Sequence, residues 1–168
     1  MIRRGVKVQL AAFLALTIVG ISFVSARYVG LGDQLFGSGY VVTADFPPSL
    51  PDVSVDPVQL DQVLTNLLEN AGRHAPKGSE IRVSVLWMHG SVQVRVSDEG
   101  PGIPLAERDR VFEAFYRGTS SPETPGSGLG LAIAKAVVVA HGGRIWIEGN
   151  PEGGCVVAFE IPGEDGLS

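Results

Sequence analysis

The spacing of apolar side chains changes along the chain, and each spacing predicts a different element. Between residues 57 and 75, apolar positions recur three and four apart, which is typical of an amphipathic helix. Asp56 suits the N-cap of this helix, Pro57 suits its first turn, and Pro76 ends the pattern. The expected buried stripe consists of Leu60, Val63, Leu64, Leu67, Leu68 and Ala71.

Alternation with a period of two follows the helix and predicts a β-hairpin. Apolar residues occupy every second position from 81 to 87 and again from 92 to 96, and His89-Gly90 between them forms the expected turn. A short strand is also expected at residues 53–55, ahead of the helix. This part of the chain therefore combines strands and a helix.

The second half of the chain places an irregular loop among further regular elements. Residues 116–128 show no periodicity and contain several glycines and prolines, which predicts a mobile loop. The elements expected around it are a helix beginning at Pro104, a helix over residues 129–141, and strands over residues 144–148 and 155–161. Helices on one face of a mixed sheet make a two-layer α+β sandwich the expected fold.

Residues 8–26 are an uncharged, mostly apolar run that predicts a transmembrane helix. At the helical rise this run is about 28 Å long, close to the hydrocarbon thickness of a bilayer. Arg3, Arg4 and Lys7 precede it, so the positive-inside rule places the N-terminus in the cytoplasm and the rest outside. A cleaved signal peptide is one alternative, since residues 24–26 resemble a cleavage site. The other is a cytoplasmic chain whose apolar run does not insert.

Length and composition limit the class of protein. The 168 residues allow one domain with an appendage, and we expect an anchor at 1–44, a domain at 45–163 and a tail at 164–168. The net charge of −5 argues against a general nucleic-acid binder. A single cysteine, Cys155, excludes a disulfide framework and a cysteine-built zinc site within the chain.

Two glycine motifs and one polar helix face carry candidate chemistry. An acid–glycine loop at residues 98–104 follows a predicted strand, where a buried carboxylate can accept a hydrogen bond from an exocyclic amine. A glycine segment at residues 126–130 leads into a helix, whose N-terminal N–H groups and positive dipole end suit phosphate. On the first helix, Asn70 can offer an oxygen to a hard cation and Arg73 can reach a phosphate.

In this order, the motifs resemble the ATP-binding domain of the GHKL superfamily, which comprises gyrase, Hsp90, histidine kinases and MutL. Within it, residues 45–163 are similar to sensor histidine kinases, which implies a Bergerat ATP-binding fold. The matching boxes are the N box at 61–76 (DQVLTNLLENAGRHAP), the G1 box at 98–104, the F box at 111–118 (VFEAFYRG) and the G2 box at 126–130. The stretch DPVQLDQVLTNLLENA looks closest to potassium-responsive kinases of the KdpD type.

The first 45 residues resemble a different family. They look like the start of actinobacterial Mce-family proteins, which are membrane-anchored, extracytoplasmic components of lipid-import systems. This resemblance implies that residues 8–26 have the membrane as partner. A Mce-type transport component is therefore an alternative, although it requires a β-rich domain after residue 45 that the sequence does not show. A non-catalytic nucleotide-binding fusion product is a further alternative.

The kinase resemblance implies ATP and Mg²⁺ as cofactors and assigns roles around them. Asp98 would recognise the adenine amino group, Asn70 would bind Mg²⁺, and Asn66 would support the phosphate site. Arg73 would meet phosphates, and His74 would lie near the sugar or base. ATP-hydrolysing members carry a glutamate where this chain has Asn66, so the resemblance argues for phosphoryl transfer and against efficient hydrolysis.

The same resemblance makes residues 116–128 an ATP lid, with Phe112 and Phe115 as its anchors and Arg117 reaching phosphate on closure. The glycines of both motifs would shape the adenine and phosphate pockets. The full ATP-binding set implied is Asn66, Asn70, Arg73, His74, Asp98, Gly100, Gly102, Ile103, Phe112, Phe115, Arg117, Gly126, Ser127, Gly128, Leu129 and Gly130.

A histidine kinase also needs a phosphoacceptor histidine on a dimerising helical hairpin. The histidines here are His74, His89 and His141, and none is expected on such a hairpin, so we assign no catalytic residue. Phosphotransfer is therefore expected only in trans, to a histidine-containing phosphoacceptor domain or a response-regulator system. An anchor with its N-terminus in the cytoplasm conflicts with this function, because Mg-ATP is scarce outside the membrane.

Overall fold

Five strands form one mixed sheet in the computed structural model, which describes residues 6–8, 41–45, 47, 50–118, 126–150 and 153–163. The strand order is β2-β4-β5-β7-β6. The strands are β2 (Val41–Asp45), β4 (Glu80–Met88), β5 (Ser91–Asp98), β6 (Arg144–Gly149) and β7 (Cys155–Pro162). All neighbours pair antiparallel except β2 and β4, which are parallel.

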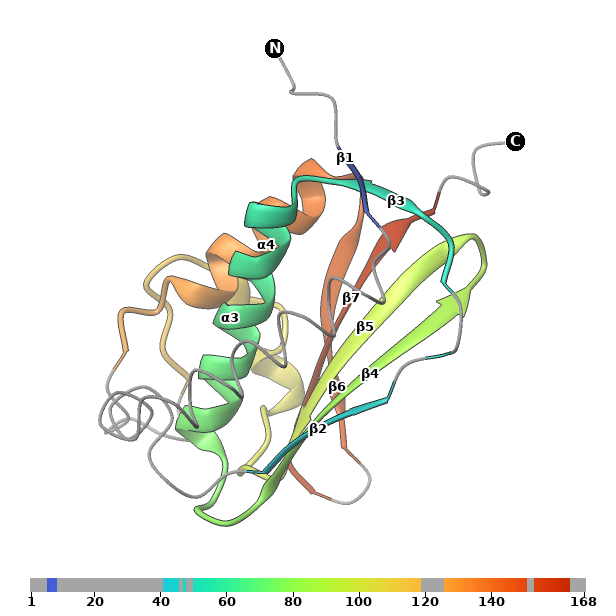
Figure 1. The fold of residues 1–168 in the computed structure, drawn as a ribbon. Coiled ribbons are helices and arrows are strands. Elements are labelled where there is room, and N and C mark those ends of the chain that lie inside the picture. Colours follow the sequence, from blue (N-terminus) through green and yellow to red (C-terminus); the bar gives the residue numbers. More distant parts are fainter. Residues whose placement is uncertain are drawn as a thin grey trace.

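Two helices lie together on one face of this sheet (Figure 1). Helix α3 (Pro57–His74) begins at Asp56, whose carboxylate accepts the N–H of Val58 at 2.9 Å, and it ends before Pro76. Helix α4 (Gly130–Ala140) is followed by Gly142, whose left-handed φ of 74° turns the chain away from the helix. These elements confirm the expected two-layer α+β arrangement and the fold implied by the resemblance.

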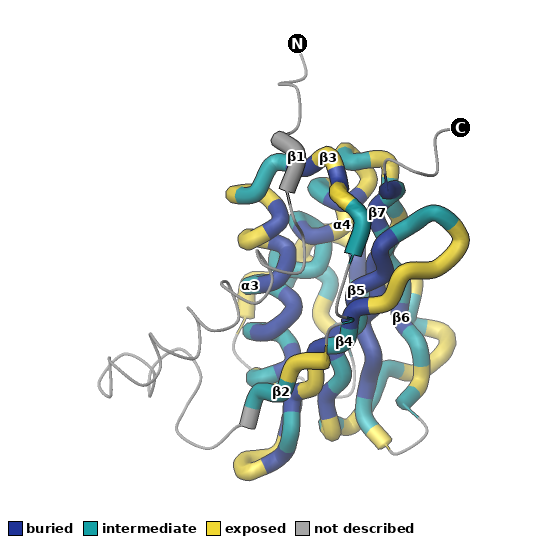
Figure 2. The backbone as a smooth tube through the Cα atoms, turned by 45° about the vertical axis from the view of Figure 1, so that its right-hand side comes forward, coloured by how far each residue is buried: buried dark blue, intermediate teal, exposed yellow. Residues whose placement is uncertain are grey.

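The core lies between the helices and the sheet (Figure 2). The apolar stripe expected on α3 is buried, as are the apolar residues expected on the inner face of the hairpin, except Trp87, which is 38% exposed. His141 joins the two helices, because one ring nitrogen accepts the backbone N–H of Asp56 at 3.1 Å and the other donates to the carbonyl of Val137 at 2.8 Å. This contact ties the start of α3 to the end of α4.

The helix expected from Pro104 is replaced by two single 3₁₀ turns, η1 (Leu105–Glu107) and η2 (Arg110–Phe112). Leu105 is 80% exposed, so the first turn of a helix here would have no apolar contact with the core. Phe112 is the buried residue of the two turns and packs against the core. Short 3₁₀ turns are common as connectors of this kind.

The N-terminal part contributes strands where an anchor was expected. Strand β1 (Val6–Val8) pairs antiparallel with β3 (Val53–Val55), so Val8 ends a strand instead of beginning a helix. Strand β2 crosses the expected boundary at residue 44 and forms one edge of the sheet. The rest of the proposed span, residues 9–26, and the tail at 164–168 lie outside the described residues. None of the helices in the described ranges combines the length and apolar character that a membrane crossing needs.

Candidate functional site

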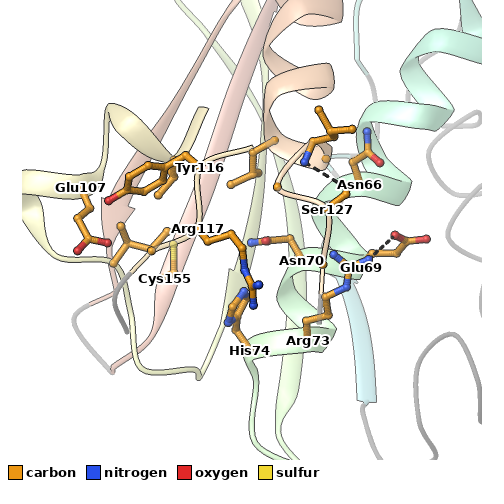
Figure 3. A pocket seen from close by; sticks show the side chains of 18 of the residues that line it. Asn66, Glu69, Asn70, Arg73, His74, Glu107, Tyr116, Arg117, Ser127 and Cys155 are labelled. Carbon is orange, nitrogen blue, oxygen red and sulfur yellow. Dashed lines mark hydrogen bonds and ion pairs between the residues drawn. The ribbon is translucent and has the colours of Figure 1, made fainter. Parts of the chain in front are cut away.

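A cavity of about 320 Å³ lies between α3, the acid–glycine loop and the start of α4 (Figure 3). It gathers most of the residues that the sequence singled out, although they come from four separate segments of the chain. Those lining it are Asn66, Asn70, Arg73, His74, Asp98, Gly102, Ile103, Arg117, Gly126, Ser127, Gly128, Leu129 and Gly130. The cavity therefore brings the N-box helix face, the acid–glycine loop and the glycine segment to one place.

Asp98 ends β5 at one end of this cavity and is only 4% exposed. Its carboxylate accepts the backbone N–H of Gly100 at 2.8 Å. Burial raises the pKa of Asp98, while the N–H groups of Gly100 and Cys155 and the nearby His74 act in the opposite direction. The result is a buried acceptor at the cavity wall, suited to an amino group.

Glycines surround Asp98 because the backbone segments beside it approach closely. A Cβ on Gly100 would lie 2.8 Å from the Asp98 carboxylate, and one on Gly102 would lie 2.9 Å from the carbonyl of Gly154. A Cβ on Gly154, which has a φ of 91°, would clash with the carbonyl oxygen of Asp98. Gly100 is thus beside the cavity and supports Asp98 without lining it.

The polar face of α3 forms another wall of the cavity, and its last residue lies beside Asp98, since a Cβ on Gly100 would be 2.8 Å from both the His74 carbonyl and the Asp98 carboxylate. Figure 3 shows Asn70, His74 and Arg117 close together, with Arg73 beside Glu69. Burial lowers the pKa of His74, with Arg73 adding to this and Asp98 opposing it. Arg73 pairs with Glu69 at 3.3 Å and lies against the glycine segment, since a Cβ on Gly126 would be 3.1 Å from its guanidinium. Arg73 of α3, together with Arg117 from the loop after η2, therefore brings positive charge to the cavity.

The glycine segment leads into α4 next to α3. Gly128 has a φ of 69°, and its carbonyl accepts the N–H of Phe115 at 3.0 Å. A Cβ on Gly130, the first residue of α4, would lie 3.8 Å from the Asn66 side chain. The N-terminus of α4 thus faces the cavity beside Asn66, with Gly126–Gly130 lining the wall, an arrangement that suits an anion.

The oxygen-bearing side chains of the cavity fit a magnesium ion that takes its remaining ligands from phosphate and water. Within the described ranges, no cluster of three or more His, Cys, Asp or Glu side chains is arranged to hold a metal. Asn66, Asn70 and Glu69 line the cavity and each carries a side-chain oxygen, whereas the side-chain nitrogen of Asn66, buried without a hydrogen-bond partner, is a donor that suits a phosphate oxygen. Mg²⁺ in nucleotide sites takes few protein oxygens and completes its shell with phosphates and water.

Besides Gly100, two predicted site residues do not line the cavity. Phe112 is buried in the core below it, which is consistent with an anchor for the loop. The side chain of Phe115 is 73% exposed, so its ring makes no contribution to the core. Phe115 instead holds the glycine segment through its backbone N–H and adopts a left-handed φ of 65°.

The cavity also contains residues that the sequence did not assign to it: Glu69, Pro101, Glu107, Val111, Tyr116, Gly118, Leu131, Ile133 and Cys155. Cys155 is buried, and burial raises its thiol pKa to about 12. Leu131 and Ile133 come within three residues after the glycine segment, and this closeness in sequence could have predicted their place in the cavity. Glu107 and Cys155 carried no such signal.

Comparison with known proteins supports one family throughout. The family model for "Histidine kinase-, DNA gyrase B-, and HSP90-like ATPase" matches residues 55–165. The chain is 38% identical over 135 residues to the adaptive-response sensory kinase SasA of Trichormus variabilis, a match that covers 79% of this chain and 33% of SasA. It is 42% identical over 133 residues to SasA of a Synechococcus strain, covering 79% of this chain and 35% of that protein. The chain thus spans about a third of the length of these curated relatives.

Solved structures agree with this match. The mycobacterial sensor histidine kinase MprB superposes with a TM-score of 0.78 at 28% identity, covering 94% of this chain and 98% of that chain. The catalytic domain of the histidine kinase ThkA superposes with a TM-score of 0.74 at 26% identity, covering 96% and 97%. Both likenesses extend over nearly the whole of the chain described above.

Proposed function

This chain belongs to the histidine kinase-, DNA gyrase B- and HSP90-like ATPase family and carries the ATP-binding catalytic domain of a sensor histidine kinase, and we propose that it binds Mg-ATP and donates the γ-phosphoryl group to a histidine in trans. The observation that carries this proposal is one cavity with a buried carboxylate at one end and the N-terminus of α4 at the other. The amino group of adenine needs a hydrogen-bond acceptor such as the carboxylate, and a polyphosphate needs N–H donors and positive potential such as a helix N-terminus.

Asp98 would recognise the base. Its carboxylate is held by the Gly100 N–H and needs a further donor to offset its burial. The exocyclic amino group of adenine provides that donor, whereas the 6-oxo group of guanine would place an acceptor against an acceptor. The glycines at 102 and 154 let their backbone segments pack closely beside Asp98, which holds the carboxylate in place.

The α4 end of the cavity would hold the phosphates. The N–H groups at the start of α4 and the side chains of Arg73 and Arg117 present positive potential there. Mg²⁺, when bound with the nucleotide, would supply further neutralisation of the phosphate charge, and Asn70 with Asn66 would hold it. The protein's contribution to phosphoryl transfer is then positioning and charge stabilisation.

Transfer is favoured over hydrolysis by the residue type at Asn66. A neutral amide cannot act as the base that activates water, and the nearby carboxylate of Glu69 is paired with Arg73. Water activation from α3 is therefore disfavoured. The bound γ-phosphoryl group would remain available to an incoming histidine.

The acceptor histidine would come from another chain or domain. His141 engages both ring nitrogens within the fold, and His89 lies in the exposed β4–β5 turn. His74 lines the nucleotide cavity itself. None of the three lies on a dimerising helical hairpin, which supports transfer to a partner such as a histidine hairpin domain.

We further propose that residues 9–26, the part of the uncharged run that follows β1, attach this domain to a membrane. The support is the uncharged run in the sequence, preceded by basic residues. The Mce-type leader and the KdpD-type branch are narrower proposals that rest on residues 1–45 and 56–71 alone. Carbonate extraction of membranes with protease protection tests attachment and side together. Recovery of the full chain in the soluble fraction would contradict attachment.

Calorimetry on the full 168-residue chain tests the main proposal. We expect saturable binding of ATP that strengthens when Mg²⁺ is added. Transfer is then measured by incubating the chain and radiolabelled ATP with a purified histidine hairpin domain of a sensor kinase and its His→Ala variant. Label on the first acceptor and not on the second supports phosphotransfer. A folded chain that binds no ATP would refute the proposed function.

A further inference from the structure

Arg108 lies directly after η1 and connects two segments next to the base end of the cavity. Its Nε donates to the carbonyl of Ile103 in the acid–glycine loop at 3.3 Å. The far end of its guanidinium lies against Gly149, the last residue of β6, where a Cβ would be 3.1 Å from Nη2. One side chain therefore spans the acid–glycine loop and the edge strand of the sheet.

Both contact points border the place where Asp98 meets the cavity. The side chain of Ile103 lines the cavity. Gly149 pairs with Cys155 in the sheet, and Cys155 pairs with Asp98 on its other side. The charge of Arg108 also lowers the pKa of the Cys155 thiol, against the larger effect of burial, which places the guanidinium close to that thiol. Arg108 thus lies next to the end of the cavity that Asp98 borders.

The setting of Arg108 differs from that of a solvated surface arginine. The side chain is half-buried, and within the described ranges no ion pair involves it. Its contacts are a backbone carbonyl and a glycine backbone, so it holds two stretches of main chain instead of a carboxylate. A planar guanidinium can donate at one side and pack with its flat surface at the other, which lysine cannot do.

We propose that Arg108 is a positioning residue that holds the acid–glycine loop against the end of β6 and so fixes the width of the adenine end of the cavity. This inference rests on the proposed ATP binding. Without the guanidinium, the loop carrying Ile103 can move away from β6, and the base loses contact on that side. The phosphates bind at the other end of the cavity and should not sense the change.

Paired ligands separate the two ends. We would measure the affinity of the full chain for Mg-ATP and for Mg-tripolyphosphate, which lacks the base, in wild type, Arg108→Met and Arg108→Lys. Arg108→Met should weaken ATP binding about five- to tenfold, the effect of one lost hydrogen bond, and leave tripolyphosphate affinity unchanged. Arg108→Lys should not restore ATP affinity. Arg144→Met, on the opposite face of the sheet, is the matched control and should alter neither ligand.

The outcomes are distinct. Equal ATP affinity in wild type and Arg108→Met, or equal loss of both ligands, would overturn the positioning role. A wild type that binds tripolyphosphate but no ATP would instead overturn the proposed function. If Arg108→Met does not fold, Gly149→Ala keeps the test open, because its Cβ would lie 3.1 Å from Nη2 and force the guanidinium to shift at its contact with β6. That variant should weaken ATP alone by about two- to fivefold, and no change in ATP affinity would again refute the inference.

Discussion

Replacing Asp98 by asparagine changes one carboxylate oxygen into an NH₂ group within a side chain that is 4% exposed. The carboxylate receives the N–H of Gly100 at 2.8 Å and also interacts with the N–H of Cys155. An amide keeps one acceptor oxygen, so its NH₂ must face either the Cys155 N–H or the amino group of adenine. Either arrangement sets a donor against a donor, and we expect weaker ATP binding.

The magnitude follows from the burial of the group. An unpaired buried donor costs about 1–3 kcal/mol, which corresponds to about a five- to 150-fold higher Kd for ATP. The free protein should respond in the opposite sense. Because burial raises the pKa of Asp98, the wild type loses stability as pH rises from the ordinary value of 3.8 through the raised folded-state pKa. Asp98→Asn has no such titration, so without nucleotide its stability relative to wild type should increase over that window.

Calorimetry with ATP and inosine triphosphate, which carries a 6-oxo group in place of the amine, checks the first effect. Asp98→Asn should lose ATP affinity and shift the ATP-to-inosine preference toward inosine. Thermal unfolding at several pH values checks the second effect, and Asp61→Asn, an exposed change on α3, serves as control. Unchanged ATP affinity, or an unchanged preference between the two nucleotides, would refute the role given to Asp98.

Three further changes test other parts of the molecule. Asn70→Ala should weaken ATP binding about fivefold more with Mg²⁺ than in EDTA, and an equal loss would refute the metal assignment. His74→Gln should remove proton uptake on ATP binding, because burial lowers the His74 pKa and phosphates would raise it; calorimetry in buffers of different ionisation enthalpy measures this, and unchanged uptake contradicts it. The same lowered pKa means that the wild type loses stability as pH falls below 6.5. His141→Ala should lower the free energy of unfolding by about 1–2 kcal/mol by removing its two hydrogen bonds, whereas His89→Asn should change it by under about 0.5 kcal/mol; equal melting of both would count against the bridge.

Local signals made several elements predictable to within one or two residues. Asp56 and Pro57 start α3, and Pro76 prevents its continuation, so both ends are encoded beside the helix itself. Gly142 ends α4 in the same way. Asp98 could also be placed in the site from sequence, because its loop and the glycine segment resemble known boxes in the correct order.

Features that depend on contacts between distant segments were not predictable in this way. Cys155 reaches the cavity because β7 pairs with β5 and places it opposite Asp98, and no local pattern fixes that register. Strand β2 belongs to the sheet through its parallel pairing with β4, although its residues appeared to end a leader. Phe115 is apolar, yet its backbone makes the contact and its ring is exposed.

The hydrogen bond from Phe115 to Gly128 has a consequence for how such domains can diverge. It fixes the two ends of the chain segment between them, so the residues in between can change in number without moving the points where they join the fold. The entropy of closing a loop grows only with the logarithm of its length, and doubling the length costs about 0.6 kcal/mol. Segments of different length can therefore replace one another between Phe115 and Gly128, while the end of the cavity beside Asp98 keeps its shape.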